Sequence, residues 1–595
     1  MIRTAQLQTP GSGLARGVSS ANSTMEVGRE AVVWHLQDKF KQYKQKGKLY
    51  DVRIDESGLT VSSEEDGMLC KRKTQVLKAS DLAGCVCMKA GVQESRTHLA
   101  YFTLYAYPLS ENKKKRTRLT LTFEVDKEDT FEKNLEIANT WRSAVHAVRN
   151  FGTAKPQTDR SKKLLVFVNP KSGPGKAHQI YKKQVASIFG EAEITHEVVL
   201  TERANHALDM VKYIDLDQYS GIIIVSGDGL LYEVYNGLLM RPDWEKAIQF
   251  PIGIIPGGSG NGLARSVAHW LNEPYMADPV LVSALNIIYG HLSPLDLVLV
   301  HTSEGKKILS FLSIGFGLLA DIDIESERLR SIGESRFVVW SAARVANLRK
   351  YHASISFRRI RDMTSNHVLK VISPLERSMT VQEEPEAASE AHPDSLSRSQ
   401  SFSPEMEKPN GASLDLSSSL IKIDSKSSGE SCETENGSRQ AYPHKDEQSR
   451  QGKLEDDSEG DNEDYRTTNG YSLPDLDKPV PDDWETIEDK FILVYACYQS
   501  HLASNVQLAP KATPNDGCMW LVVMRGTASK SNVAKFLLGL DGSHINVPGV
   551  EMIPVDALRI VPSGNSGYLN VDGEVIPWGP VQLHVLPGKG QIITR

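Results

Sequence analysis

Three glycine-rich turns follow apolar runs of the sequence, where they could bind phosphate. They cover residues 169–176 (NPKSGPGK), 226–229 (SGDG) and 256–262 (PGGSGNG). Glycine lets backbone N–H groups approach a phosphate closely, and a helix that begins after the turn adds partial positive charge. The first turn is not a Walker A loop, because the first glycine of that pattern is missing and Ala177 follows Lys176. Glycine could simply make tight strand-to-helix turns, but three such turns together favour a nucleotide site.

Asp228 lies between Gly227 and Gly229 in the second turn. A carboxylate beside a phosphate site is poorly placed to bind an anion, but it is well placed to accept a proton from an attacking hydroxyl group. The pattern therefore predicts phosphoryl transfer with Asp228 as the general base. Two alternatives stay open: an Asp that caps the following helix, and an Asp that holds Mg²⁺ through water.

We expect a parallel, doubly wound α/β domain at about residues 161–292 to hold these turns. Buried strands are predicted at residues 164–168, 194–200, 222–225 and 252–255, with helical stretches between them. In such a sheet, ligands bind at the carboxyl ends of the strands.

Alternation of apolar and polar residues predicts an antiparallel β-sandwich at residues 293–372 and 481–595. Residues 373–480, between its two parts, are rich in Ser, Glu, Asp and Pro and nearly lack large apolar side chains, so we expect a disordered insertion. A long loop adds little closure entropy, so the β-domain can tolerate it. Three serines are candidate phosphorylation sites: Ser399, Ser401 and Ser403.

The N-terminal part is predicted to begin with a disordered leader at residues 1–28, which are polar and rich in Gly and Ser. Residues 29–152 show short strands closed by one amphipathic helix after Asp129, an arrangement that suggests a pleckstrin-homology-like domain. A predicted hairpin loop carries five cations within residues 113–118. These cations could bind an anionic membrane or act as a nuclear-import signal, or the loop could be a solvated tip.

Charge and composition exclude several classes of protein. The net charge of −7 provides no basic field for nucleic acid. The six cysteines form no CxxC pair, which argues against a disulfide framework and a zinc site and fits a reducing compartment. We find no apolar core of a signal peptide, and no apolar run approaches the roughly 18 residues of a membrane-spanning helix.

Seven segments together resemble the sphingosine kinases, within the diacylglycerol-kinase-like lipid kinases: NPKSGPGK, LTERANHA, SGDGLLYEVYNGL, RPDWE, PGGSGNGLA, ADIDIESERLR and VDGE. The match covers about residues 161–360 and 480–595, and the N-terminal block and the insertion resemble the longer animal isoform. The resemblance implies an enzyme that uses ATP and Mg²⁺. It would phosphorylate the primary hydroxyl group of sphingosine and other sphingoid bases, giving sphingosine 1-phosphate.

The resemblance also implies roles for individual residues. The implied nucleotide contacts are Asn169, Pro170, Lys171, Thr201, Glu202, Arg203, Ala204, Asn205, Gly258, Ser259, Gly260, Arg330, Arg336, Asp572, Gly573 and Glu574. The implied substrate contacts are Ser226, Gly227, Asp228, Gly229, Ser313 and Asp323, with Asp228 as the base. No metal ligand is assigned, because Mg²⁺ is expected to be held mainly by the ATP phosphates. Tyr232 replaces the His usual in the animal enzymes, and we expect it to tune the pocket without abolishing activity.

Asp323 would bind the head group for a chemical reason. A carboxylate facing a primary ammonium and a hydroxyl group offers charge-assisted hydrogen bonds of about 1.5–3 kcal/mol. Diacylglycerol lacks this cation, and the nitrogen of ceramide is an uncharged amide. Without the resemblance, Asp323 would be interpreted as a surface residue in an acidic run with Asp321 and Glu325.

Some interpretations remain open. Residues 336–351 (RFVVWSAARVANLRKY) form a basic amphipathic stretch, which could be a lid over the lipid pocket or a calmodulin-binding helix. A ceramide kinase and a catalytically silent lipid-binding adaptor are alternative functions. We expect a cytoplasmic protein that binds membranes peripherally, with a nuclear pool if residues 113–118 act as an import signal.

Overall fold

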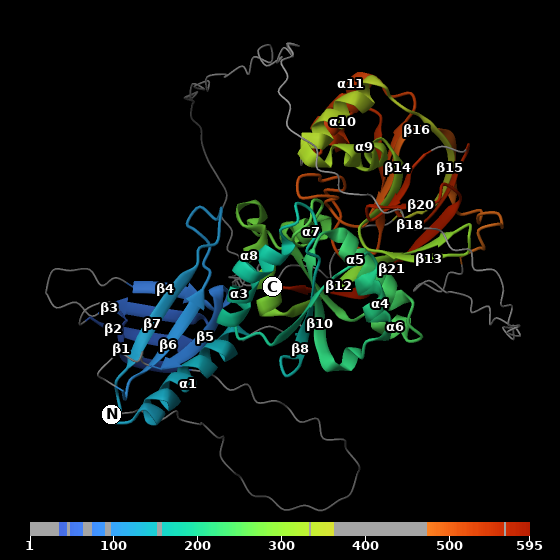
Figure 1. The fold of residues 1–595 in the computed structure, drawn as a ribbon. Helices are drawn as coiled ribbons and strands as arrows, with labels where there is room; N and C mark the ends of the chain where they lie inside the picture. The colour runs from blue at the N-terminus through green and yellow to red at the C-terminus, as the bar shows by residue number, and fades with distance from the viewer. Residues whose placement is uncertain are drawn as a thin grey trace, which may run out of the picture. The chain divides into compact units, whose positions relative to one another are not determined.

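The computed structural model describes residues 35–43, 48–63, 74–89, 97–150, 157–332, 335–361, 473–564 and 567–595, with the side chains of residues 330–332 excepted. These residues form one sheet of seven strands and one of fourteen (Figure 1). The predicted leader, and the predicted insertion up to residue 472, lie outside the described residues. No helix in the described ranges is long and apolar enough to cross a membrane.

The N-terminal sheet is antiparallel, in the order β4-β3-β2-β1-β7-β6-β5, and is followed by a single helix, α1 (Phe131–Arg149). Its strands are β1 (Leu36–Gln42), β2 (Leu49–Asp55), β3 (Gly58–Ser63), β4 (Thr74–Lys78), β5 (Leu82–Lys89), β6 (Ala100–Ala106) and β7 (Leu119–Val125). Trp141 of α1 stacks on Phe102, with ring centroids 5.7 Å apart. The N-cap is Thr130, not the predicted Asp129, because the Thr130 side chain accepts a hydrogen bond from the backbone N–H of Lys133.

The α/β part contains four parallel strands in the order β9-β8-β10-β11, as predicted. The strands are β8 (Lys163–Val168), β9 (His196–Leu200), β10 (Tyr219–Ser226) and β11 (Pro251–Pro256). The helices are α2 (Ala177–Ile180), α3 (Ala186–Glu191), α4 (His206–Tyr213), α5 (Asp228–Leu239), α6 (Trp244–Ala247), α7 (Gly262–Trp270) and α8 (Pro279–Tyr289). Strand β9 begins later than predicted, because the N–H of Ile194 bonds to Phe189 and closes the preceding helix.

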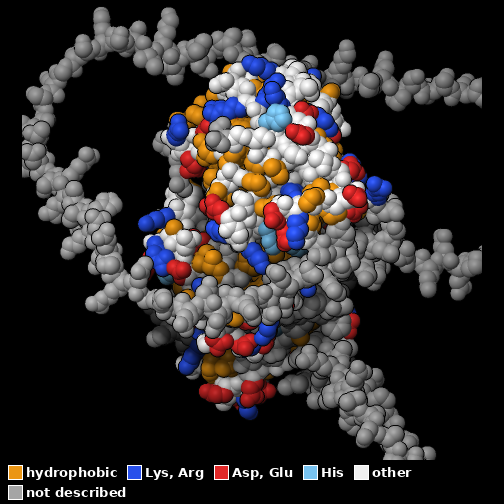
Figure 2. Space-filling model, turned by 90° about the vertical axis from the view of Figure 1, so that its right-hand side faces the viewer, with side chains coloured by type: hydrophobic (Ala, Val, Ile, Leu, Met, Phe, Trp, Pro, Cys, Tyr) orange, Lys and Arg blue, Asp and Glu red, His pale blue; other side chains and the backbone are white. Residues whose placement is uncertain are grey.

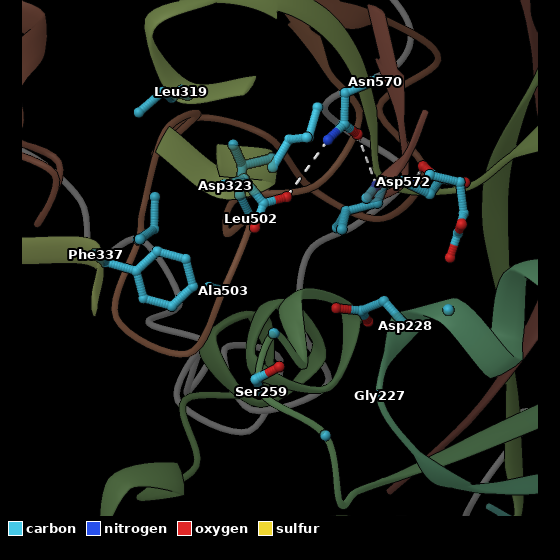
Figure 3. Close-up of a pocket in the computed structure, with 18 of the residues that line it drawn as sticks. Gly227, Asp228, Ser259, Leu319, Asp323, Phe337, Leu502, Ala503, Asn570 and Asp572 are labelled. Atoms are coloured by element: carbon cyan, nitrogen blue, oxygen red, sulfur yellow. Dashed lines mark hydrogen bonds between the residues drawn. The ribbon is translucent and has the colours of Figure 1, made fainter. Parts of the chain in front are cut away.

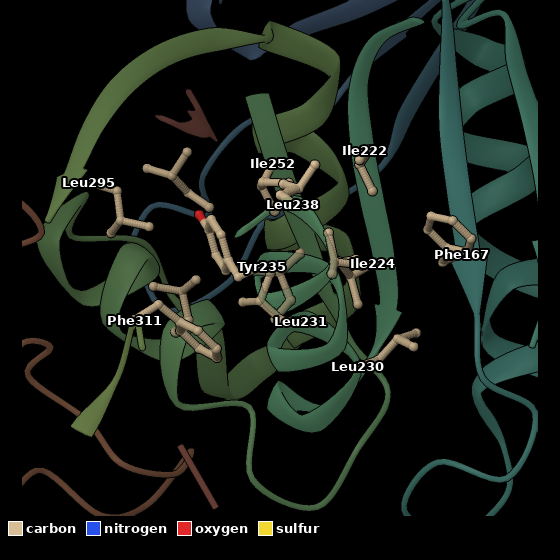
Figure 4. Packing of buried hydrophobic residues seen from close by; sticks show 14 of the residues in the cluster. Phe167, Ile222, Ile224, Leu230, Leu231, Tyr235, Leu238, Ile252, Leu295 and Phe311 are labelled. Carbon is tan, nitrogen blue, oxygen red and sulfur yellow. The ribbon is translucent and has the colours of Figure 1, made fainter. Parts of the chain in front are cut away.

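Helices cover both faces of this parallel sheet, which confirms the doubly wound arrangement. Residues of α4, α5 and α7 pack on one face, and residues of α3 and α8 pack on the other. Figure 4 shows Leu231, Tyr235 and Leu238 of α5 against Ile224 and Ile252 of the sheet. Because α5 is anchored along its length, its first residue has a defined position at the end of β10.

The C-terminal part is antiparallel, but it continues the same sheet. Its strands are β12 (His291–Thr302), β13 (Lys307–Ser310), β14 (Ser313–Gly317), β15 (Tyr351–Arg359), β16 (Glu485–Cys497), β17 (Met519–Arg525), β18 (Val550–Pro562), β19 (Leu569–Val571), β20 (Glu574–Ile576) and β21 (Val581–Thr594). Strand β21 pairs in parallel with β11 and antiparallel with β12 and β18. Strands β16 and β18 each pair with β15 along one half and with β17 along the other, so the sheet folds back into a sandwich-like unit.

The predicted insertion ends earlier than residue 480. Residues 473–480 form a coil held by two side chains of the β-part. The Arg559 guanidinium donates to the carbonyl oxygens of Asp475 and Lys478, and the Gln582 amide donates to that of Pro474. The polar composition of this coil could not reveal that its backbone satisfies a buried guanidinium.

Figure 2 shows one face of the molecule, on which hydrophobic side chains are interspersed with charged ones. Lys and Arg alternate with Asp and Glu over the described residues of this face, without a continuous basic stripe.

Candidate active site

A pocket of about 800 Å³ lies where the three glycine-rich turns meet the C-terminal β-part (Figure 3). The turns lie on one side of the pocket. The opposite side is formed by α9 (Leu318–Ser326), α10 (Ser335–Ala346), the hairpin of β19 and β20, and the end of α11 (Lys530–Leu538). The sheet thus brings together segments that are far apart in the sequence.

Most predicted site residues line this pocket: Asn169, Lys171, Ser226, Gly227, Asp228, Gly229, Gly258, Ser259, Gly260, Ser313, Asp323, Arg336, Asp572, Gly573 and Glu574. Pro170 is absent from the lining but adjoins Asn169. Arg330 lies in a short 3₁₀ segment (Glu327–Ile332), and its side chain is outside the described residues.

The segment predicted to run along the nucleotide does not line the described pocket. Thr201, Glu202, Arg203, Ala204 and Asn205 follow β9 at the same edge of the sheet as the first turn. The N–H of Thr201 bonds to the carbonyl oxygen of Val168, and the guanidinium of Arg203 pairs with Asp209 at 2.6 Å. Their predicted contact with the nucleotide therefore stays a prediction.

The glycines have a second role that the sequence did not suggest, because the three turns pack directly against one another. A Cβ atom on Gly258 would lie 2.4 Å from the Cα of Gly227, and one on Gly173 would lie 2.9 Å from the carbonyl carbon of Gly258. Ser172, which we did not single out, accepts a hydrogen bond of 3.1 Å from the N–H of Gly227. Close packing of the turns thus requires glycine, whether or not phosphate is bound.

Asp228 is the first residue of α5, but it caps a different helix. Its carboxylate accepts hydrogen bonds from the N–H groups of Gly262 (2.7 Å) and Leu263 (3.4 Å), at the start of α7. The alternative that Asp228 caps the helix following it is therefore wrong, because the N-cap of that helix, α5, is Gly227. Burial raises the pKa of Asp228 to about 6, although these backbone donors oppose the shift. A carboxylate with this pKa is largely ionised at neutral pH and is more basic than an exposed one, as a general base requires.

Asp323 differs from its acidic neighbours in what it faces. Asp321 accepts hydrogen bonds from the Tyr351 hydroxyl group, and Glu325 pairs with Arg344 and Arg349. Asp323 instead lines the pocket, across from Asp228 (Figure 3). Burial raises the pKa of Asp323 to about 6. The interpretation of Asp323 as an ordinary surface residue is therefore wrong.

Helix α10 forms part of the pocket wall, through Phe337, Val338 and Ser341. This position supports the lid interpretation of residues 336–351, and calmodulin binding stays a prediction. The Arg336 guanidinium pairs with Glu327 and lies 4.4 Å from the centroid of the Phe337 ring. Arg336 therefore reaches the pocket but is already paired.

Two predicted residues have other surroundings than expected. Asp572 lines the pocket, but buried donors of the β13–β14 turn bond to its carboxylate. Tyr232 does not line the pocket but packs against two hydrophobic clusters, one in the α/β part and one in the β-part. Its hydroxyphenyl ring therefore joins the two parts.

Within the described ranges, no three His, Cys, Asp or Glu side chains are grouped so that they could hold a metal ion. These residues therefore offer no protein cage for the Mg²⁺ expected with ATP.

Comparison with known proteins agrees with this geometry. A family model described as the diacylglycerol kinase catalytic domain matches residues 163–300. A second, the YegS C-terminal NAD kinase beta sandwich-like domain, matches residues 480–594. Among solved structures, a putative diacylglycerol kinase from Bacillus anthracis has 14% identity and a TM-score of 0.42, covering 75% of this chain and 98% of its own, which is too distant to add to the assignment.

Two human relatives are closer. Sphingosine kinase 2 of Homo sapiens is 31% identical over 606 residues, covering 94% of this chain and 91% of its own length. Sphingosine kinase 1 of Homo sapiens is 29% identical over 431 residues, covering 71% of this chain and 89% of its own length. With both catalytic regions matched and one relative aligned over nearly the whole chain, this chain belongs to the sphingosine kinase family and is a lipid kinase that uses ATP.

Proposed function

We propose that this protein transfers the γ-phosphoryl group of ATP to the primary hydroxyl group of sphingosine and related sphingoid bases. The observation that carries the proposal is a pair of carboxylates, Asp228 and Asp323, that line one pocket from opposite sides. Asp228 adjoins the glycine-rich turns. The same pocket has apolar lining residues that include Leu319, Ile322, Phe337, Leu537 and Leu540.

In the proposed reaction, the hydroxyl oxygen of the lipid attacks the γ-phosphorus atom. The new O–P bond forms as the bond to the bridging oxygen of ADP breaks, and Asp228 accepts the hydroxyl proton. The turn at Gly258–Gly260 and the side chain of Lys171 line the same pocket and would stabilise charge on the phosphates. The proton then passes from Asp228 to solvent when the products leave.

Asp323 would select the substrate. Its carboxylate would pair with the ammonium group of a sphingoid base, which diacylglycerol and ceramide lack. The apolar lining residues of the pocket would hold the hydrocarbon chain. Because that chain leaves a bilayer to enter the pocket, its burial adds little net free energy, and the head-group contacts decide the preference.

Assays with radiolabelled ATP and sphingosine, ceramide and diacylglycerol side by side test this function. We expect the highest kcat/KM for sphingosine. A preference for ceramide would identify a ceramide kinase, and no turnover of any of the three lipids would identify a silent adaptor. Either outcome overturns the proposal.

We also propose that residues 29–152 form a pleckstrin-homology-like domain that helps a cytoplasmic enzyme to bind anionic membranes. Seven antiparallel strands followed by one packed helix support this assignment. Lys113, Lys114 and Lys115 are exposed in the β6–β7 loop. A nuclear pool through the same lysines is the competing proposal.

The other two cations of this loop are already paired. Arg116 is buried and pairs with Glu273 (2.7 Å) and Asp81 (3.1 Å), while Arg118 pairs with Glu191 (2.6 Å). The proposed membrane contact therefore uses three cations and not five.

A further inference from the structure

We propose that the β19–β20 hairpin positions the head-group site and that Asn570 is the positioning residue for Asp323. This inference rests on the proposed sphingoid-base site. It adds a residue that the sequence did not single out, and it changes the role of Asp572, which the resemblance placed at the nucleotide.

Asn570 is 3% exposed, and both ends of its amide have partners (Figure 3). Its Oδ1 atom accepts a hydrogen bond of 2.8 Å from the N–H of Gly573, within the same hairpin. Its Nδ2 atom donates a hydrogen bond of 3.4 Å to Oδ2 of Asp323. The first bond fixes the orientation of the amide, so the second presents a fixed donor to the Asp323 carboxylate.

Asp572 holds the neighbouring turn. Its Oδ1 atom accepts hydrogen bonds from the Ser310 hydroxyl group (2.7 Å) and from the N–H groups of Leu312 and Ser313 (both 2.9 Å), and its Oδ2 atom accepts one from Phe311 N–H (3.1 Å). Each carboxylate oxygen has about two acceptor positions, so these donors fill Oδ1 and leave one position on Oδ2. Asp572 therefore holds the turn that carries Ser313.

The same hairpin lies against the segments that carry three polar residues of the site, Ser313, Asp323 and Asp228. Strand β14 begins at Ser313, pairs with β19, and leads directly into α9, which carries Asp323. On its other side, the hairpin brings Glu574 close to Gly229, where an added Cβ would lie 3.2 Å from the Glu574 carboxylate. Gly229 follows the proposed base, so the hairpin links the base to the head-group carboxylate.

Several charged or titratable groups surround Asp323. Arg336 on α10 favours its ionised form, whereas Glu327 and Glu574 oppose it, and the buried Tyr495 hydroxyl group of β16 faces it. The Asn570 donor also favours the ionised form. Without this donor the pKa of Asp323 rises further. As the pH is lowered, Asp323 is then protonated at a higher pH and no longer pairs with the ammonium group.

The test compares Asn570→Asp with wild type. Aspartate keeps the acceptor for Gly573, but it removes the donor to Asp323 and adds a negative charge beside it. Asn532→Asp is the matched control, because Asn532 lies on α11, outside the pocket lining. The values of kcat, kcat/KM for sphingosine and KM for ATP are measured between about pH 5 and 8, together with thermal melting.

We expect Asn570→Asp to lower kcat/KM for sphingosine by about tenfold at pH 7. The acid limb of kcat/KM should move up by about one pH unit, because this limb reports groups of the free enzyme. The acid limb of kcat reports Asp228 in the complex and should not move. The KM for ATP should not change. If Asn570→Asp does not fold, Asn570→Ser, which removes the amide from Asp323, is judged by the same criteria.

Unchanged kcat/KM and pH dependence in a folded Asn570 variant would overturn the proposal. Equal losses in kcat, sphingosine use and ATP use, with lowered melting, would also overturn it, because they indicate a purely structural role. A wild-type enzyme that does not prefer sphingosine refutes the proposed function instead, so the two failures can be told apart.

Discussion

Replacing Asp228 by Asn should make the protein more stable and nearly inactive at the same time. The carboxylate is buried at 7% exposure, and its pKa is raised from 3.8 to about 6. A raised pKa means that the folded state favours the neutral acid, so burial of the charge lowers stability above pH 6 and costs nothing below about pH 4. Asparagine is neutral at every pH and avoids this cost.

The size of the effect follows from the two hydrogen bonds and the pKa shift. A shift of about 2 units corresponds to about 3 kcal/mol at pH 7 or above. Asparagine keeps one acceptor for the 2.7 Å bond from Gly262 and loses the 3.4 Å bond from Leu263, at a cost of about 1 kcal/mol. We therefore expect the variant to gain about 2 kcal/mol at pH 8 and to lose this advantage near pH 4. Its kcat should fall by about 10²–10⁴-fold, because general-base catalysis contributes that much.

The assay combines kcat at saturating sphingosine and ATP with thermal melting at pH 5 and pH 8. Asp243→Asn is the control, because the Asp243 side chain is exposed, pairs with Arg241 and does not line the pocket. If Asp228→Asn kept more than about a tenth of wild-type kcat, Asp228 would not be the general base. A variant that melts below wild type at pH 8 would contradict the argument from the buried charge.

Four other changes test separate parts of the site and the chain. Asp323→Asn should lower kcat/KM for sphingosine about 10- to 150-fold with little change in KM for ATP, and unchanged sphingosine kinetics would remove Asp323 from the site. Asp572→Asn should lower the melting temperature without a matching rise in KM for ATP, whereas a selective loss of ATP binding would restore the nucleotide role. Deleting residues 373–472, but not the coil that Arg559 holds, should leave kcat near that of wild type, and loss of most activity would show that the segment contributes to chemistry. Changing all three lysines at residues 113–115 to Ala should weaken sedimentation with phosphatidylserine vesicles at low salt, at about 1 kcal/mol per lysine, while equal binding would favour nuclear import or a passive loop.

Local sequence patterns were sufficient to predict the helices and strands named below and much of the site. The four parallel strands, the helix after β7 and the alternating C-terminal strands follow from periodicities that span only a few neighbouring residues. The glycines around Asp228 marked the turn that lines the pocket. The resemblance to lipid kinases added Asp323, which periodicity had left as one of three equivalent acids.

The partners of these residues depended on the tertiary structure. Asp228 caps α7, 34 residues away, and Asn570 reaches Asp323 across 247 residues. Arg116 appeared to be a free cation of a basic loop, but it pairs with Glu273, 157 residues away. None of these contacts produces a local signal, because neither residue of a pair changes the pattern around the other.

The tertiary structure also decided that the parallel and antiparallel parts share one sheet. Periodicity predicted a parallel and an antiparallel unit, whereas β21 joins them into one sheet. A strand's pattern records which of its faces is buried, but not which strand lies beside it. The sequence therefore determined the elements and the chemistry available at their ends, and the pairing of distant strands determined which of these groups face one another across the pocket.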